Sequence, residues 1–240
     1  MHALIDLLKS DMKPALGVTA PGAIAFAVST ACSYLDGEVD SIELRLNSGI
    51  YKNAFTCGIP SSPHLGNLYA AALGAIAADP SMGLECLSSV TPADNKAAEK
   101  MIADGRITVL LSEVSSRIHI EVVARCGDEY TEVIIWDSHT NITCIKHNGE
   151  IVKGSDSPAY DQSEPSEPSI IHKYTLQDFV NLVNEVSFED IAFIKDAYTV
   201  NLHLYDVAMA SDRTTFAKLL YKNNGNKTIS DNAVDTASLL

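Results

Sequence analysis

The first stretch of the chain that could do chemistry runs from Lys13 to Gly22. Two prolines and two glycines bracket a short turn there, and a helix is expected to begin at its end. The backbone N–H groups in the first turn of a helix have no partner inside that helix. They can therefore bind a carboxylate or another anion, with Thr19 as an additional hydroxyl donor. The same residues also fit a well-capped corner between two helices, which needs no ligand.

The second candidate segment, from Tyr51 to Pro60, combines a lysine and an asparagine with a Gly-Pro loop. We expect Lys52 and Asn53 to come after a strand. Lys52 could bind the carboxylate of an amino acid, and Asn53 its amine or its carboxylate. The alternative is an exposed lysine at the end of a strand followed by a turn asparagine, with no role in binding.

The third candidate segment contains His139, between two expected strands and flanked by groups that can form hydrogen bonds. An imidazole titrates near neutral pH, so His139 could contact a ligand or carry a proton, with Thr140 and Asn141 beside it. Because the segment from Asp137 to Asn141 consists of turn-forming residues, an ordinary hairpin turn fits equally well.

The cysteines and the other histidines show no spacing typical of a metal site. The chain has five cysteines, an odd number without a Cys-x-x-Cys pair, so neither a zinc site nor a disulfide framework follows from them. We expect reduced thiols in a cytoplasmic protein, and we assign no residue as a metal ligand. His119 and His147 are expected to be ordinary surface residues.

The composition narrows the classes of partner. The 240 residues carry 17 Lys and Arg against 31 Asp and Glu, which gives a net charge of −14 with neutral histidines. So acidic a surface repels phosphate backbones and anionic lipid headgroups, and neither nucleic acid nor a membrane is expected as a partner. The start of the chain lacks the basic region of a signal peptide. The apolar stretches fall short of the ~20 residues of a membrane span.

Residues 1–90 have a mainly helical pattern and carry the first two candidate segments. A single strand is expected at 42–46, where apolar and polar residues alternate. Helices are expected near 5–8, 21–31 and 69–78. This N-terminal segment therefore has to place the candidate binding residues around one strand.

Residues 91–173 are expected to form a β-rich domain. Thr91 and Pro92 predict the start of a helix that ends near Ala103. Four strands are expected after it, at 107–111, 118–123, 132–136 and 142–147. Their lengths and turns predict an antiparallel β meander covered by helices. A long Ser/Pro loop at 154–169 ends the domain.

Residues 174–240 are expected to begin an incomplete all-helical domain. Its predicted helices lie at 175–186, 188–197 and 214–221. The apolar pattern continues to Leu240, so we expect this segment to need a further packing partner. The fold class predicted for the whole chain is α+β, with the meander and its covering helices flanked by helical segments.

Four motifs in chain order carry a resemblance to a known family. They are Lys13-Pro14-Ala-Leu-Gly17-x-Thr19-x-Pro21, Tyr51-Lys-Asn-Ala-Phe with Gly58-Ile-Pro60, Ala70-Ala-Ala-Leu-Gly74 with Gly83-Leu-Glu-x-Leu87, and His139-Thr-Asn-Ile142. In this order and spacing they resemble the N-terminal half of the L-cysteine desulfidase family. This serine dehydratase alpha-chain-like group was formerly grouped as an uncharacterised protein family. The resemblance runs in register from Leu8 to about Asn201.

The resemblance implies an oxygen-sensitive lyase that uses a [4Fe–4S] cluster. Such an enzyme removes the β-substituent of L-cysteine or L-serine and gives pyruvate, ammonia and sulfide or water. One iron of the cluster acts as a Lewis acid on the leaving group. In this family the cluster cysteines belong to the C-terminal half, which follows the end of this sequence, so the resemblance implies that this chain ligates no cluster.

The resemblance also implies roles for individual residues, without assigning a catalytic one. The implied substrate-binding residues are Thr19, Lys52, Asn53, His139, Thr140 and Asn141. The implied motif or structural residues are Lys13, Pro14, Gly17, Pro21, Gly58 and Pro60. The flanking helical segments would belong to an incomplete catalytic domain.

The chain departs from the family in two ways. The first motif often reads Gly-Cys-Thr-Glu-Pro, whereas here Val18 replaces the cysteine and Ala20 the glutamate. The chain is also about half of the family's length, so we expect it to be inactive without a C-terminal catalytic half. Its expected partners are a small amino acid and either that half or further copies of the chain. The alternatives are a non-catalytic amino-acid-binding or subunit-association module, and a remnant that lacks its packing partner.

Overall fold

The structure is a computed structural model, and it describes residues 2–12, 19–114, 118–155, 170–212 and 216–227. It divides the chain into two compact units. One is Pro14–Pro165, and the other joins Met1–Lys13 to Ser166–Leu240. The sequence analysis placed its divisions after residues 90 and 173. The Ser/Pro loop expected at 154–169 lies outside the described residues, apart from its first two positions.

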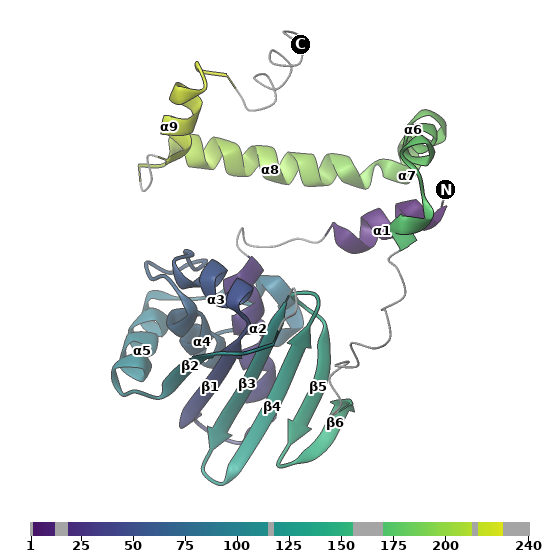
Figure 1. Cartoon of the computed structure of the whole chain (residues 1–240). Helices are drawn as coiled ribbons and strands as arrows, with labels where there is room; N and C mark the ends of the chain where they lie inside the picture. The colour runs from purple at the N-terminus through teal and green to yellow at the C-terminus, as the bar shows by residue number, and fades with distance from the viewer. Residues whose placement is uncertain (1, 13–18, 115–117, 156–169, 213–215, 228–240) are drawn as a thin grey trace. The chain divides into compact units, whose positions relative to one another are not determined.

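The unit Pro14–Pro165 is built on one six-stranded sheet, with strand order β2-β1-β3-β4-β5-β6 (Figure 1). The strands are β1 (Ser41–Leu46), β2 (Ile107–Leu111), β3 (His119–Cys126), β4 (Glu129–Trp136), β5 (Ile142–His147) and β6 (Glu150–Gly154). The α+β prediction is confirmed. The meander runs antiparallel through β3, β4, β5 and β6, and β1 also pairs antiparallel with β3.

The sheet is mixed, because β1 and β2 pair in parallel, with Ile42 opposite Ile107. The strand at 107–111, expected as the first strand of the antiparallel meander, lies instead at the edge of the sheet and pairs with β1. The strand expected within residues 1–90 also lies between β2 and β3, in the same sheet as the strands that follow residue 91. Ile42, Leu44 and Leu46 are buried, which explains why an apolar strand from the first segment takes an inner position.

Helices cover one face of this sheet (Figure 1). They are α2 (Thr19–Cys32), α3 (Ser48–Phe55), α4 (Asn67–Ile76), the 3-10 helix η1 (Pro80–Glu85) and α5 (Pro92–Ala103). α2 packs on β3 and β4, and α4 packs on α2 and β2. The Ala- and Gly-rich sequences of α2 and α4 allow this close approach. A Cβ atom on Gly74 would lie 2.9 Å from the Cα of Ala25.

α5 begins and ends where the sequence predicts. The Thr91 hydroxyl accepts a hydrogen bond from the backbone N–H of Asp94, and the Asp94 carboxylate accepts one from the backbone N–H of Thr91. This reciprocal pair satisfies two N–H groups that the helix would otherwise leave without partners. The cap therefore fixes the residue at which α5 begins.

The second unit is helical and has a small core. Its elements are α1 (His2–Asp11), η2 (Ile170–Lys173), α6 (Leu176–Glu185), α7 (Phe188–Ile191), α8 (Phe193–Ala210) and α9 (Phe216–Asn223). Leu4, Ile5 and Leu182 form its buried cluster. The helix expected at 188–197 is divided between α7 and the much longer α8. No residue of α8 is buried.

Candidate functional site

The first motif is described only from Thr19 onward. Lys13, Pro14 and Gly17 lie outside the described residues, as does Val18. Thr19 opens α2 and is half-buried. Neither an acidic side chain nor a basic one lies in the terminal turns of α2, so the partial positive charge of its first turn is not offset locally.

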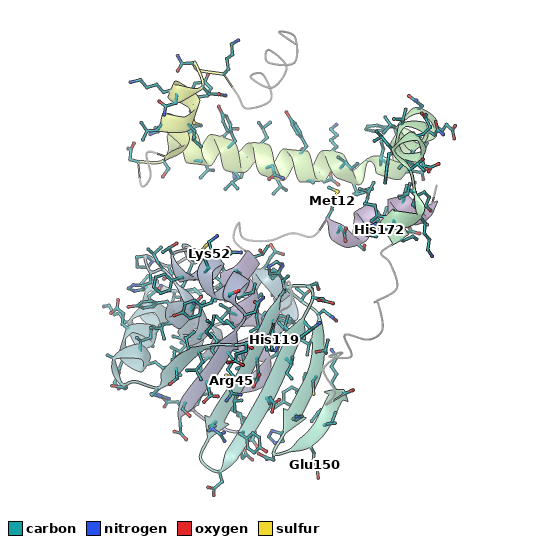
Figure 2. The ribbon with its side chains drawn as sticks, in the orientation of Figure 1. Met12, Arg45, Lys52, His119, Glu150 and His172 are labelled. Carbon is teal, nitrogen blue, oxygen red and sulfur yellow. The ribbon has the colours of Figure 1, made fainter. Side chains whose placement is uncertain are left out.

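Lys52 and Asn53 follow β1, but they lie within α3 and not at a strand end or in a turn. Asn47 causes this difference, because its side chain accepts a hydrogen bond from the N–H of Ile50 and starts a helix directly after β1. Both predicted side chains are exposed, and Figure 2 shows Lys52 at the surface. An asparagine followed by a serine after an alternating strand is the signal that could have predicted this helix. Gly58 and Pro60 lie in the loop beyond α3.

The segment with His139 forms the connection between β4 and β5. Asn141 is bound into this turn, because its amide donates to the backbone oxygen of Trp136 at 3.0 Å. His139 and Thr140 are half-buried. Desolvation lowers the pKa of His139 below its usual value, so the neutral imidazole predominates near neutral pH. The turn is hydrogen-bonded as an ordinary hairpin connection, which leaves His139 and Thr140 as the candidates to contact a ligand.

The structure brings the predicted segments to one end of the sheet. We call this the motif end, the end at which β1 and β4 finish and β3 begins. Asn47 and His119 join β1 to β3 there by two hydrogen bonds, Asn47 N to His119 O at 3.2 Å and His119 N to Asn47 Oδ1 at 3.3 Å. His119 lies opposite Trp136, which precedes the turn with His139.

α2 and α4 both begin at the motif end (Figure 1). The chain that follows α2 reaches the opposite end of the sheet, where the N–H of Asp36 donates to Glu129 at 3.4 Å. α2 must therefore start at the motif end, which places Thr19 there. α4 starts beside α3, since the Asn67 amide donates to the backbone oxygen of Tyr51 at 3.2 Å. The segments with Thr19, Lys52 and His139 therefore share one end of the sheet.

His119 is buried, contrary to the expectation of a surface residue (Figure 2). Its ring packs edge-on against Trp136, with the ring centroids 5.2 Å apart. Among the described residues, its Nδ1 atom has no hydrogen-bond partner. Desolvation lowers the pKa of His119, so its ring is neutral near neutral pH. His147, also expected at the surface, is half-buried and lies 3.1 Å from the Thr131 hydroxyl.

The first turn of α4 is a feature that the sequence analysis missed. Gly66 occupies the N-cap with a φ of 95°, and no side chain caps the helix. A Cβ atom on Gly66 would lie only 2.7 Å from the backbone oxygen of Phe55. Asn67 is 5% exposed, and in the described part of the chain its Oδ1 atom has no hydrogen-bond partner. A buried amide oxygen without a partner is costly, and no sequence pattern marked it.

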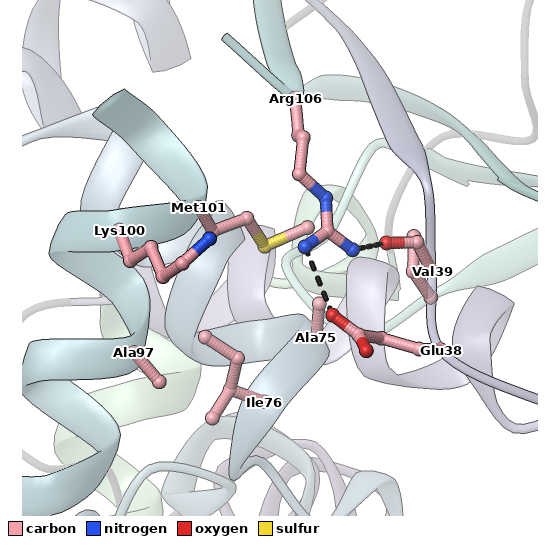
Figure 3. Close-up of a pocket in the computed structure, with 8 residues that line it drawn as sticks. All are labelled: Glu38, Val39, Ala75, Ile76, Ala97, Lys100, Met101 and Arg106. Atoms are coloured by element: carbon pink, nitrogen blue, oxygen red, sulfur yellow. Dashed lines mark hydrogen bonds and ion pairs between the residues drawn. The ribbon is translucent and has the colours of Figure 1, made fainter. Parts of the chain in front are cut away.

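A cavity of about 350 Å³ lies at the opposite end of the sheet, between α4, α5 and the starts of β1 and β2 (Figure 3). Arg106 is its most polar wall residue, and its guanidinium already binds Glu38 at 2.9 Å and the backbone oxygen of Val39. Lys100 is paired with Asp104 at 2.6 Å. Its charged groups are therefore satisfied within the protein, and none of the predicted site residues lines it.

No group of three or more His, Cys, Asp or Glu side chains that could hold a metal ion occurs within the described ranges. All five cysteines are free thiols. Burial raises the pKa of Cys32 and of Cys86 to about 12, so both are protonated near neutral pH. The described residues therefore do not form a ligand set for an iron–sulfur cluster. In the same part of the chain, no helix combines the length and the apolar character needed to cross a membrane.

Comparison with known proteins finds relatives named UPF0597 protein. That of Dichelobacter nodosus is 31% identical over 97% of this chain, and that of Kosmotoga olearia is 34% identical over 95%. That of Klebsiella pneumoniae is 33% identical over 82%. The chain covers 53%, 54% and 45% of these proteins, so it spans about half the length of the relatives it matches. No family model and no solved structure matches the chain.

Proposed function

We propose that the chain is the N-terminal, substrate-binding part of a β-eliminating lyase that acts on L-cysteine or L-serine. The products would be pyruvate, ammonia and sulfide or water. The four motifs support the substrate class, because their order and spacing resemble the L-cysteine desulfidase family. The relatives support the proposal that this chain is one part of a longer enzyme, because they match nearly all of this chain with only about half of their own length.

The surface of α8 carries the proposal that the chain works with a further polypeptide. Seven large apolar side chains of this helix are between 39% and 68% exposed. They are Ile194, Tyr198, Val200, Leu202, Leu204, Tyr205 and Val207. A helix with apolar residues on several sides belongs in the core of a larger assembly. We assign this surface to a polypeptide that corresponds to the unmatched part of the relatives.

The motif end supplies binding groups in this proposal. The first turn of α2, with Thr19, would donate hydrogen bonds to the substrate, and Lys52 and Asn53 would contact the polar groups of the amino acid. His139 is neutral near neutral pH, so it would accept a proton or a hydrogen bond beside Thr140 and Asn141. The family resemblance places the cysteine ligands of the [4Fe–4S] cluster in the C-terminal half. The roles assigned to this chain are therefore binding and orientation.

A pyruvate assay with two arms tests the proposal. The purified chain is reconstituted anaerobically with iron and sulfide and given L-cysteine or L-serine. The same assay is run on the chain co-expressed with the unmatched part of the Kosmotoga olearia relative. We expect no pyruvate from the chain alone and pyruvate from the complemented chain, with Lys52→Met reducing the rate. Turnover by the chain alone would contradict the proposed division of the enzyme.

The second candidate function is a non-catalytic module that binds an amino acid or associates subunits. Its support is the face of the sheet away from the helices, where partly exposed charged residues could contact a second subunit. Arg45 binds Glu43 at 2.5 Å and Glu121 at 2.7 Å across this face. Sedimentation measurements separate the two candidates. A stable oligomer of the isolated chain that binds cysteine and gains no activity on complementation would favour the module.

A further inference from the structure

We propose that the first turn of α4 binds the α-carboxylate and the α-ammonium of an amino acid, and that Asn67 recognises the ammonium. The inference rests on the proposed function and deepens it, because it assigns a subsite for the part that cysteine and serine have in common. Asn67 is outside the motifs that the sequence analysis identified. Three features of the molecule support the subsite: the hydrogen-bond donors of α4, the amide oxygen of Asn67, and the charge around them.

The first turn of α4 offers free hydrogen-bond donors. The first helical hydrogen bond at this end is donated by Ala70 to the backbone oxygen of Gly66, so the N–H groups of residues 67, 68 and 69 lie ahead of the helical ladder. No side-chain cap satisfies them, because glycine occupies the N-cap position. A glycine is required there by its φ of 95° and by the 2.7 Å approach of the Phe55 oxygen to a notional Cβ atom. A carboxylate is the ligand that such a turn favours.

Asn67 adds an acceptor beside these donors. Its Nδ2 atom is committed to the backbone oxygen of Tyr51 at 3.2 Å, which fixes the amide with Oδ1 as the unpaired atom. The residue is 95% buried, and a buried amide oxygen without a donor costs about 1–3 kcal/mol. An ammonium group would satisfy it with a charge-assisted hydrogen bond. Donors for a carboxylate next to an acceptor for an ammonium match the zwitterion of an α-amino acid.

The charge around the first turns of α4 and α2 favours binding of an anion, although the net charge of the protein repels anions. The chain has a net charge of −14, yet the first turns of α4 and α2 contain no acidic side chain. On the packed helix α5, the Glu99 carboxylate lies 2.9 Å from His64 Nε2, and the His64 ring stacks on Tyr69 of α4 with the ring centroids 4.0 Å apart. The positive ends of two helix dipoles therefore face the motif end, and neither first turn contains a competing carboxylate of its own. Alanine would bind as cysteine and serine do, because the subsite contacts only the groups common to all three.

Amide NMR shifts and calorimetry on the full chain test the subsite. The probes are L-alanine, propionate, which lacks the ammonium, and ethylamine, which lacks the carboxylate. We expect L-alanine to shift the amide resonances of residues 67–69. Propionate and ethylamine should bind about 10- to 100-fold more weakly, the factor that corresponds to one lost hydrogen bond to a charged group.

Two substitutions separate recognition from folding. Asn67→Leu removes the acceptor at nearly constant volume and should weaken L-alanine about 10-fold or more. Asn67→Asp keeps the shape and adds a negative charge, so it should weaken propionate and strengthen ethylamine. Unfolding cannot produce these opposite changes. Asn181→Leu, an exposed position on α6, is the matched control and should leave binding unchanged.

Three outcomes would overturn the inference. The first is undiminished L-alanine binding by Asn67→Leu. The second is L-alanine shifts confined to other residues, such as the turn with His139. The third is the absence of any response to L-alanine at millimolar concentration. The pyruvate assay of the complemented chain is independent of these measurements, so pyruvate formation together with any of the three would leave the proposed function standing and remove only this subsite.

Discussion

Replacing Asn47 with alanine should loosen the motif end and lower the stability of the sheet unit. Asn47 is 3% exposed, and its Oδ1 atom accepts from the N–H of Ile50 in α3 and from the N–H of His119 in β3. Loss of a helix N-cap costs about 1 kcal/mol. The backbone N–H of the buried His119 would be left without an acceptor, which costs a further ~1–3 kcal/mol of stability. We therefore expect a total loss of about 2–4 kcal/mol, a large share of the ~5–15 kcal/mol that typically stabilises a domain.

Urea unfolding followed by tryptophan fluorescence measures this loss. The chain has one tryptophan, and Trp136 lies opposite His119 at the motif end, so its emission reports on the sheet unit. Asn47→Asp keeps an accepting oxygen at the same place and should lose less stability than Asn47→Ala. An Asn47→Ala variant within about 0.5 kcal/mol of the parent chain would refute the reasoning, because a surface substitution without structural role has an effect of that size.

Three further predictions follow from single residues. His119 has a pKa below its usual 6.5 in the folded chain, so the unfolded chain binds more protons and stability should fall as the pH drops through 6.5 and below. Urea titrations between pH 7.5 and about 5 check this, and His119→Phe should make the profile shallower, while His139, whose pKa is also lowered, keeps a part of the slope. Gly74→Ala should destabilise the sheet unit, because overpacking against Ala25 costs about 1–3 kcal/mol and exceeds the ~1 kcal/mol gain in helix propensity. An unchanged or higher urea midpoint of the Gly74→Ala variant would contradict this prediction. The pKa values of Cys32 and Cys86 are raised to about 12. Both thiols should therefore resist iodoacetamide at pH 8 until urea unfolds the chain. Rapid labelling of these two cysteines in the native protein would show instead that they are accessible thiolates.

The local elements of the fold could be predicted from the sequence, because their signals are local. The alternation of Ile42, Leu44 and Leu46 predicts β1, and the Thr91 cap predicts the start of α5. The parallel pairing of β1 with β2 could not be predicted in this way. It joins residues more than sixty positions apart through tertiary packing, and periodicity contains no information about strand order.

The candidate site was predictable only in part. The segments with Thr19, Lys52 and His139 reach the same end of the sheet, which the order of the motifs does not by itself require. The helical position of Lys52 was missed because a single cap at Asn47 decides it. The importance of Asn67 depends on burial and on an unpaired oxygen atom, and both arise only after α3 and α4 have packed together.

The surface of α8 gives a further test of the proposed partner. Val200→Lys and Leu204→Lys place charges on exposed apolar positions, at 68% and 57% exposure. We expect these changes to leave the urea midpoint of the sheet unit unchanged and to abolish co-purification with the unmatched part of the relative. Asn184→Lys on α6 is the control. Co-purification of the charged α8 variants at the parent level would show that the partner does not bind this helix.

The most direct test of the account is the fate of uniformly ¹³C-labelled L-serine, followed by ¹³C NMR. The reconstituted chain is incubated anaerobically with the labelled serine, first alone and then with the unmatched part of the Kosmotoga olearia relative. The account predicts no labelled pyruvate from the chain alone and labelled pyruvate after the second polypeptide is added. Labelled pyruvate from the chain alone would contradict the account. The account would also be contradicted if a complex that co-purifies with an intact iron–sulfur cluster formed no pyruvate from labelled L-serine and none from labelled L-cysteine.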